Sequence, residues 1–132
     1  MNGNVYILRV GEDGLQFKGY LEKFSEHLFS ELSIDKEWME EINITDELSV
    51  IANREGAVMG LPLNRALYDE SGNLLTVFGG NIFVCKKDKN GIEDGITPDD
   101  VRLIESRLWA VHGISHGFVF RKDQDGLCEW QG

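Results

Sequence analysis

The chain has 132 residues, of which 42% are hydrophobic and 27% charged, and its formal net charge is −10. This length and composition are typical of soluble globular proteins, so we expect a single domain over residues 1–132. The negative charge disfavours direct contact with nucleic-acid phosphates, and no apolar run approaches the roughly 20 residues that span a bilayer. We therefore expect no nucleic-acid or membrane partner. Two distant cysteines and the lack of a signal-peptide pattern at the start predict a cytoplasmic protein.

The first half of the chain predicts a strand, a helix and a hairpin. Residues 4–10 are β-branched and aromatic and precede the turn-forming sequence Gly-Glu-Asp-Gly, which predicts a strand and a turn. In residues 20–32, apolar side chains recur every three or four positions, which predicts an amphipathic helix. The apolar stripe of this helix would consist of Leu21, Phe24, Leu28 and Leu32. Residues 40–53 read as two extended runs around residues 45–47, which predicts a hairpin.

Turn-forming residues punctuate the middle of the chain at residues 53–56, 69–73 and 88–91. They separate apolar runs, as expected for antiparallel strands joined by turns. Residues 74–86 form the most strand-like run, interrupted by Gly79 and Gly80. The two glycines indicate either a hairpin or a bulge where other backbone approaches closely.

A second helix is predicted from Thr97, which would cap the helix, and Pro98, which suits its first turn. Asp99 and Asp100 follow, where negative charge favours a helix N-terminus. The apolar stripe would consist of Val101, Ile104, Leu108 and Val111. The helix should end near Gly113, and a final strand and a turn at residues 125–126 should follow. The sequence therefore predicts an α+β fold, a mostly antiparallel sheet with two amphipathic helices packed on it.

Candidate catalytic and metal-binding patterns are weak in this sequence. His112 and His116 have the spacing of zinc ligands on one helical turn, but neighbouring glycines oppose a helix and no third ligand lies nearby. The alternative is an imidazolium at the end of the second helix. Residues 88–95 contain oxygen donors but lack the glycine and glutamate positions of a calcium loop. We predict no metal and no cofactor, and nothing in the sequence supports a catalytic residue.

Acidic residues dominate residues 35–55, where seven carboxylates accompany two cations. One interpretation is an acidic surface that binds a basic groove on a host protein, with Glu40 and Glu41 as candidate contacts. The other is a solvated surface that only keeps the protein soluble.

The segment from Gly60 to Asn73 has an unusual composition for an apolar stretch. Pro62 should keep its predecessor extended, and Asn64 should satisfy backbone groups as a turn residue. Arg65 is the only cation between Arg54 and Lys86. Its planar guanidinium could pair with Asp69 or Glu70, or it could bind a carboxylate or phosphate of a small ligand.

Residues 50–85 resemble a small domain family of unknown function found in bacteriophages, prophages and conjugative elements. The resemblance rests on an Asn-x-x-Gly turn, a Leu-Pro-x-Asn-Arg-Ala segment and a strand containing glycine. The family positions are Asn53, Gly56, Pro62, Asn64, Arg65 and Gly80. The resemblance carries no known activity, and its mobile-element setting implies an accessory protein that binds a host component.

Two functional hypotheses follow from the sequence. The first is a non-catalytic accessory protein of a phage or mobile element that acts through its acidic surface on a host protein. The alternative is a protein that binds a small anionic ligand, a nucleotide or a metabolite, in a pocket around Asn64 and Arg65. Asn81, which follows the paired glycines, is a further candidate contact.

Overall fold

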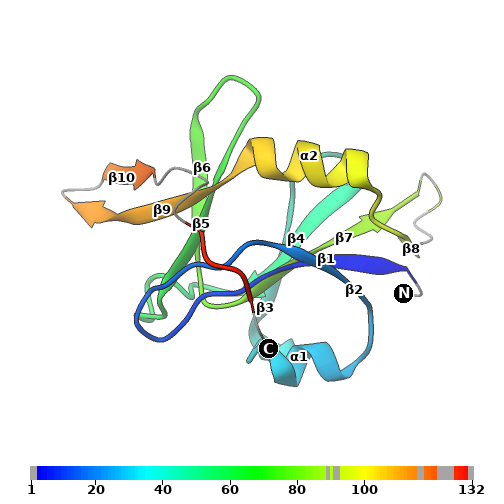
Figure 1. Cartoon of the computed structure of the whole chain (residues 1–132), viewed down its shortest axis with the longest axis horizontal. Helices are drawn as coiled ribbons and strands as arrows, with labels where there is room; N and C mark the ends of the chain where they lie inside the picture. The colour runs from blue at the N-terminus through cyan, green and yellow to red at the C-terminus, as the bar shows by residue number, and fades with distance from the viewer. Residues whose placement is uncertain (1–2, 89, 91–92, 116–117, 122–126, 131–132) are drawn as a thin grey trace.

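The strands of the protein form two antiparallel sheets (Figure 1). The structure is a computed structural model that describes residues 3–88, 90, 93–115, 118–121 and 127–130. The first sheet has the order β2-β1-β7-β4-β3, with β8 beside β7. Its strands are β1 (Asn4–Leu8), β2 (Tyr20–Lys23), β3 (Met39–Asn43), β4 (Leu48–Asn53), β7 (Ile82–Lys87) and β8 (Glu93–Asp94). The second sheet has the order β10-β9-β5-β6. Its strands are β5 (Leu63–Tyr68), β6 (Leu74–Gly79), β9 (Leu108–Ser115) and β10 (Phe118–Arg121).

This architecture confirms the prediction of mostly antiparallel strands with a few helices, although the strands divide between two sheets rather than one and the two predicted amphipathic helices are only partly present. The predicted first strand is β1, and it lies between β2 and β7. The predicted hairpin is the antiparallel pair β3 and β4, with Asn43 opposite Ser49. Turns occupy residues 54–60 and 69–72 as expected. Parts of the predicted turns at residues 88–91 and 125–126 lie outside the described residues.

The first predicted helix is mostly wrong. Tyr20–Lys23 is strand β2, paired with β1, and only α1 (His27–Glu31) is helical, followed by the short 3-10 helix η1 (Lys36–Trp38). Leu21 is 39% exposed, so it does not belong to a buried stripe. A short isolated helix has little stability of its own. Residues 20–23 instead pair along their whole length with β1, in four antiparallel residue pairs. Strand pairing with β1 therefore determined the structure of residues 20–23, although their apolar spacing is typical of a helix.

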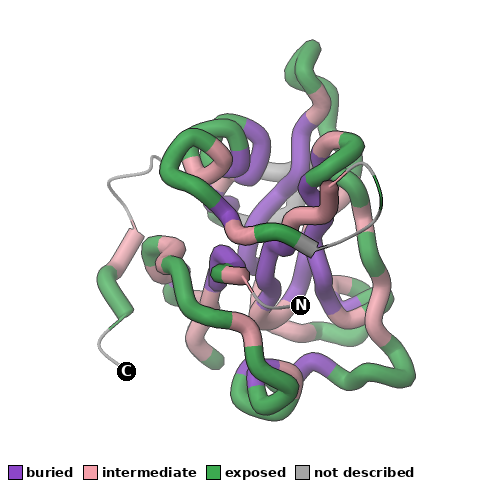
Figure 2. The backbone as a smooth tube through the Cα atoms, turned by 90° about the vertical axis from the view of Figure 1, so that its right-hand side faces the viewer, coloured by how far each residue is buried: buried purple, intermediate pink, exposed green. Residues whose placement is uncertain are grey.

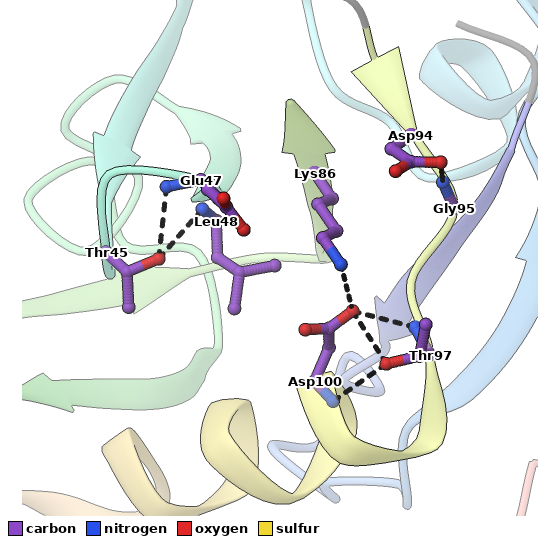
Figure 3. Close-up of polar contacts among 8 residues, drawn as sticks. All are labelled: Thr45, Glu47, Leu48, Lys86, Asp94, Gly95, Thr97 and Asp100. Atoms are coloured by element: carbon purple, nitrogen blue, oxygen red, sulfur yellow. Dashed lines mark hydrogen bonds and ion pairs between the residues drawn. The ribbon is translucent and has the colours of Figure 1, made fainter. Parts of the chain in front are cut away.

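The second predicted helix begins where expected and ends early. Helix α2 (Pro98–Arg107) has Thr97 as its cap, and Thr97 and Asp100 form a reciprocal capping box (Figure 3). Lys86 of β7 donates to Asp100 Oδ2 at 3.0 Å, which ties the helix start to the first sheet. The helix ends at Arg107 because the next residues form β9, whose Leu108 and Ala110 lie opposite residues of β5.

The central strands of the first sheet, β1, β4 and β7, are buried on both faces, because α1 lies below the sheet and α2 above it (Figure 1). Val5 and Ile7 pack with Leu28 and Leu32 on the α1 face. Tyr6 and Leu8 point to the opposite face, where they pack with Ile104 of α2 and with residues of the second sheet. Figure 2 shows that the buried residues are concentrated in the strands at the centre of the molecule. This arrangement explains why β1 is apolar without alternation.

The chain passes from one sheet to the other at Gly79 and Gly80. Strands β6 and β7 are adjacent in sequence but belong to different sheets, so the expected hairpin is wrong. The alternative expectation of close backbone approach is confirmed, because a Cβ at Gly79 would lie 2.6 Å from the backbone carbon of Gly56. Gly80 has φ +83°, a conformation that glycine adopts without strain.

Candidate functional site

A cavity of about 300 Å³ lies between the first sheet, the second sheet and α2. Its lining combines an arginine, a lysine, a glutamate and a tyrosine with apolar side chains. The lining residues are Tyr6, Leu8, Lys18, Gly19, Arg65, Ile104, Glu105, Leu108, Ala110 and Leu127. A partly apolar cavity with a few convergent polar groups is the usual form of a small-molecule site.

A β-bulge in β5 orients two of the predicted site residues. Leu63 pairs with Gly79 and Arg65 pairs with Phe78, so Asn64 is an extra residue in β5. Neighbouring residues of a regular strand point to opposite faces, but a bulge bends the strand and redirects its side chains. Here the bulge allows the side chains of Asn64 and Arg65 to meet, with Arg65 Nη1 2.7 Å from Asn64 Oδ1.

Asn64 is a buried connector between the sheets rather than the turn residue that the sequence predicted. Its Nδ2 atom donates to the carbonyl oxygen of Leu8 in the first sheet and to that of Gly80, both at 2.9 Å. The residue is fully buried. Because a buried carbonyl without a donor is costly, these two hydrogen bonds from Asn64 stabilise the junction between the sheets.

Arg65 is only 2% exposed, yet the structure shows no carboxylate bonded to its guanidinium among the described residues. Nη1 donates to the backbone and side-chain oxygens of Asn64, and Nη2 donates to the carbonyl oxygen of Phe17 at 2.6 Å. Burial lowers the pKa of Arg65 to about 10, partly opposed by Tyr6 and Glu105. The guanidinium is therefore still charged at neutral pH. It lines the cavity, and its described hydrogen-bond acceptors are all neutral oxygens.

The expected internal pair between Arg65 and Asp69 or Glu70 is wrong. Asp69 Oδ1 accepts from the backbone of Ser71 and Asn73 and organises the turn between β5 and β6. Asp69 and Glu70 line a separate hollow that also contains Arg107. The bulge explains the error, because it directs Arg65 to the interior and leaves the acidic turn at the tip of the hairpin.

Tyr6 and Glu105 also line the cavity. The Tyr6 hydroxyl donates to Glu105 Oε1 at 2.6 Å, joining β1 to α2 across 99 positions of sequence. Burial, and then the nearby carboxylate, raise the pKa of Tyr6, so it remains a donor. Gly19 makes room for this ring, because a Cβ there would collide with the end of Tyr6. The sequence contains no local signal for this pair, since β1 is uniformly apolar and Glu105 lies on the polar side of α2.

The rim is formed by residues 16–19 together with the C-terminal segment, residues 127–130. Phe17 pairs with Cys128, and Lys18 N donates to Cys128 O at 2.6 Å. The guanidinium of Arg9 lies 4.3 Å from the ring centre of Trp130, which anchors the same segment. These contacts place Lys18 and Leu127 at the cavity.

The remaining predicted contacts lie away from the cavity. Asn81 Oδ1 accepts from Val10 N at 2.8 Å and its Nδ2 donates to Leu32 O, which makes it a connector of loops. Glu40 and Glu41 are consecutive on edge strand β3, so they point to opposite faces. Glu41 pairs with Lys87 at 3.0 Å. The two candidate contacts of the acidic segment therefore do not share one face of the sheet.

The histidine pattern does not form the expected helix terminus, because His112 lies in strand β9. His116 lies outside the described residues. Within the described part of the chain, no cluster of three or more histidine, cysteine, aspartate or glutamate side chains could hold a metal ion. Cys85 and Cys128 do not form a disulfide, and Cys85 is buried. None of the described helices is long and apolar enough to traverse a bilayer.

Comparison with known proteins identifies the family. No curated protein and no solved structure matches the chain. A family model described as a domain of unknown function, DUF3846, matches residues 33–108, which is more than half of the chain. The matched part contains Asn64, Arg65 and Glu105, whereas Tyr6, Lys18 and Leu127 of the cavity lie outside it. The chain belongs to the DUF3846 family of domains of unknown function.

Proposed function

We propose that the protein binds a small anionic ligand in the cavity between the two sheets, with Arg65 as the principal contact. The observation that carries the proposal is a buried guanidinium that lines an open cavity and bonds only to neutral oxygens of described residues. A buried charge is normally paired. A carboxylate or phosphate that enters the cavity would supply the missing partner through charge-assisted hydrogen bonds.

The geometry of the guanidinium supports this function. Arg65 is fixed by hydrogen bonds from Nη1 to Asn64 and from Nη2 to Phe17. A cation fixed in one orientation loses less freedom when it binds an anion than a flexible surface lysine does. Lys18, an exposed residue at the rim, adds positive charge at the entrance. The apolar lining can accommodate a short hydrocarbon part of the ligand.

The cavity is favoured over the acidic surface as the functional site. A docking surface needs its charges on one side, and Glu40 and Glu41 point to opposite faces of β3. Arg65, in contrast, shares one cavity with three other polar side chains. The sequence resemblance supports an accessory role in a mobile element, and binding of a small anionic ligand is compatible with that role.

Isothermal titration calorimetry tests the proposal with three probes, 4-methylpentanoate, inorganic phosphate and AMP. We expect at least one probe to bind. Arg65→Met should weaken its affinity by about 10-fold to 100-fold, because the variant lacks the charge-assisted hydrogen bonds of the guanidinium. Lys36→Met serves as a control because Lys36 is an exposed cation away from the cavity lining. Equal affinity in the wild type and Arg65→Met, or no binding by any probe, would refute the function.

A further inference from the structure

We infer that the ligand is a zwitterion with a short apolar body, and that it places an anionic group on Arg65 and an ammonium group on Glu105. This inference rests on the proposed function and specifies its ligand class. It starts from the charges of the cavity, where a buried cation and a carboxylate line the same space. The two groups interact electrostatically, yet within the described residues no ion pair joins them at 4.0 Å or less.

The separation of these charges gives the cavity a dipole. A simple anion would gain the attraction of Arg65 and lose part of it to repulsion by Glu105. A zwitterion oriented along the cavity would gain from both charges at once. Arg65 is buried, whereas Glu105 is an exposed residue. Electrostatic energies are larger beside a buried charge than in water, so Arg65 contributes most of the binding energy and Glu105 selects between otherwise identical ligands.

Glu105 is held in a fixed position by its hydrogen bond to Tyr6. The bond occupies Oε1, and no described residue donates to Oε2, so one carboxylate oxygen remains available to an ammonium donor. Because Tyr6 is 3% exposed and its ring fits against Gly19, its hydroxyl holds the Glu105 carboxylate at the cavity. The site therefore has a positioned acceptor as well as a positioned cation.

The size and remaining lining of the cavity indicate the body of the ligand. Leu8, Ile104 and Leu108 line the same cavity and give it aliphatic surface beside the two charged groups. A cavity of about 300 Å³ is at the small end of ligand pockets. An aliphatic amino acid or an amine-bearing small carboxylic acid matches these features, because it combines both charges with a few apolar carbons.

A matched set of three probes isolates the two charges, namely leucine, 4-methylpentanoate without the amine, and 3-methylbutylamine without the carboxylate. By calorimetry we expect leucine to bind at least about 10-fold more tightly than either partial probe. Glu105→Gln, which keeps an acceptor for Tyr6, should weaken the binding of leucine and strengthen the binding of 4-methylpentanoate. Glu31→Gln is the control because this exposed residue lies on α1, outside the cavity lining.

The outcomes distinguish the inference from the proposed function. If 4-methylpentanoate binds as tightly as leucine and Arg65→Met weakens both, the zwitterion inference is overturned and anion binding stands. If the amine alone binds as tightly as leucine, or if leucine does not bind, the inference is also overturned. If Arg65→Met leaves every affinity unchanged, both fail. A reversal of the preference between leucine and 4-methylpentanoate in Glu105→Gln supports the inference, and circular dichroism verifies that this variant is folded.

Discussion

The side chains of Asn64 and Arg65 contact each other although the residues are consecutive on strand β5, with Asn64 Oδ1 2.7 Å from Arg65 Nη1. The contact depends on the bulge at Asn64, which turns both side chains toward the interior. Asn64 then holds backbone of the first sheet with its amide nitrogen and the guanidinium with its amide oxygen. One residue therefore joins the two sheets and orients the principal cation of the cavity.

We expect Asn64→Ala to lower the free energy of unfolding by about 2 to 4 kcal/mol, because the carbonyl groups of Leu8 and Gly80 would lose their donor. Urea denaturation monitored by fluorescence measures this change. Asn4→Ala is the matched control because Asn4 is exposed at the start of β1. A loss no larger than that of the control would show that the Asn64 hydrogen bonds do not stabilise the fold.

Arg65→Met should change the free energy of unfolding by less than about 1.5 kcal/mol, since removing a buried cation offsets the lost hydrogen bonds. Had a buried ion pair with Asp69 or Glu70 existed, the loss would be about 3 to 5 kcal/mol. Urea denaturation of the ligand-free protein separates the two cases. A loss in the larger range would mean that Arg65 is primarily a structural residue, and the cavity proposal would lose its basis.

Gly19→Ala should destabilise the protein by about 1 to 3 kcal/mol, because the added methyl group would displace the Tyr6 ring. It should also weaken ligand binding, since Glu105 would lose the hydrogen bond that positions it. Thermal melting and calorimetry measure the two effects. Gly95→Ala tests the specificity of the change, because a Cβ at Gly95 would make only ordinary contacts of 3.5 Å or more. Similar melting of both variants would contradict the packing argument.

The Lys86–Asp100 pair should make stability depend on pH at both extremes (Figure 3). Burial raises the pKa of Asp100, but hydrogen bonds from Thr97 and Lys86 outweigh it, so the pKa is lowered. Its contribution is complete above the ordinary pKa of about 3.9 and is lost as pH falls through the lowered value. The hydrogen bond from Lys86 to Asp100 raises the pKa of Lys86. The lysine contribution is therefore complete below its ordinary pKa of about 10.4 and is lost as pH rises through the raised value.

Asp100→Asn should consequently cost about 1 kcal/mol at pH 7, and the difference from the wild type should disappear in strong acid. Urea unfolding between pH 2 and pH 7 measures it. Asp46→Asn provides the comparison, because Asp46 is exposed in the turn between β3 and β4. A difference that is constant over this pH range would exclude the charge of Asp100 as its source.

We predict that the purified protein contains no stoichiometric metal, since the three histidines and two cysteines have no spacing that closes a tetrahedral site. Elemental analysis of protein prepared without chelators tests this. One zinc ion per chain that is lost in the double variant His112→Ala, His116→Ala would contradict the prediction.

The sequence predicted those parts of the fold that have strong local signals. The capping of α2 by Thr97 and the hairpin of β3 and β4 depend on residues close in sequence, and both were predicted. Strands β2 and β9 were misread as helix because their partners lie elsewhere in the chain. The division into two sheets was not predictable from the apolar run of residues 74–86, which continues through the crossing.

The same distinction applies to the site. Arg65 was identified because a lone cation in an apolar segment is unusual, but its bulge and its true partners depend on the pairing of β5 with β6. Tyr6 and Glu105 were missed because each has an ordinary position in its own element. Their contact exists only after the chain has folded across nearly its whole length.

Because the chain crosses between the sheets at Gly79 and Gly80, the two sheets can unfold separately. Among the described strands, none of one sheet pairs with a strand of the other, so each sheet has its own hydrogen-bond ladder. The cooperativity of unfolding between the two sheets therefore depends on the apolar residues that both sheets bury together and on the hydrogen bond from Asn64 to Leu8. Native-state hydrogen exchange should show one cooperative unit in the wild type. In Asn64→Ala, the amides of β5, β6 and β9 should exchange through openings that leave β1, β4 and β7 protected.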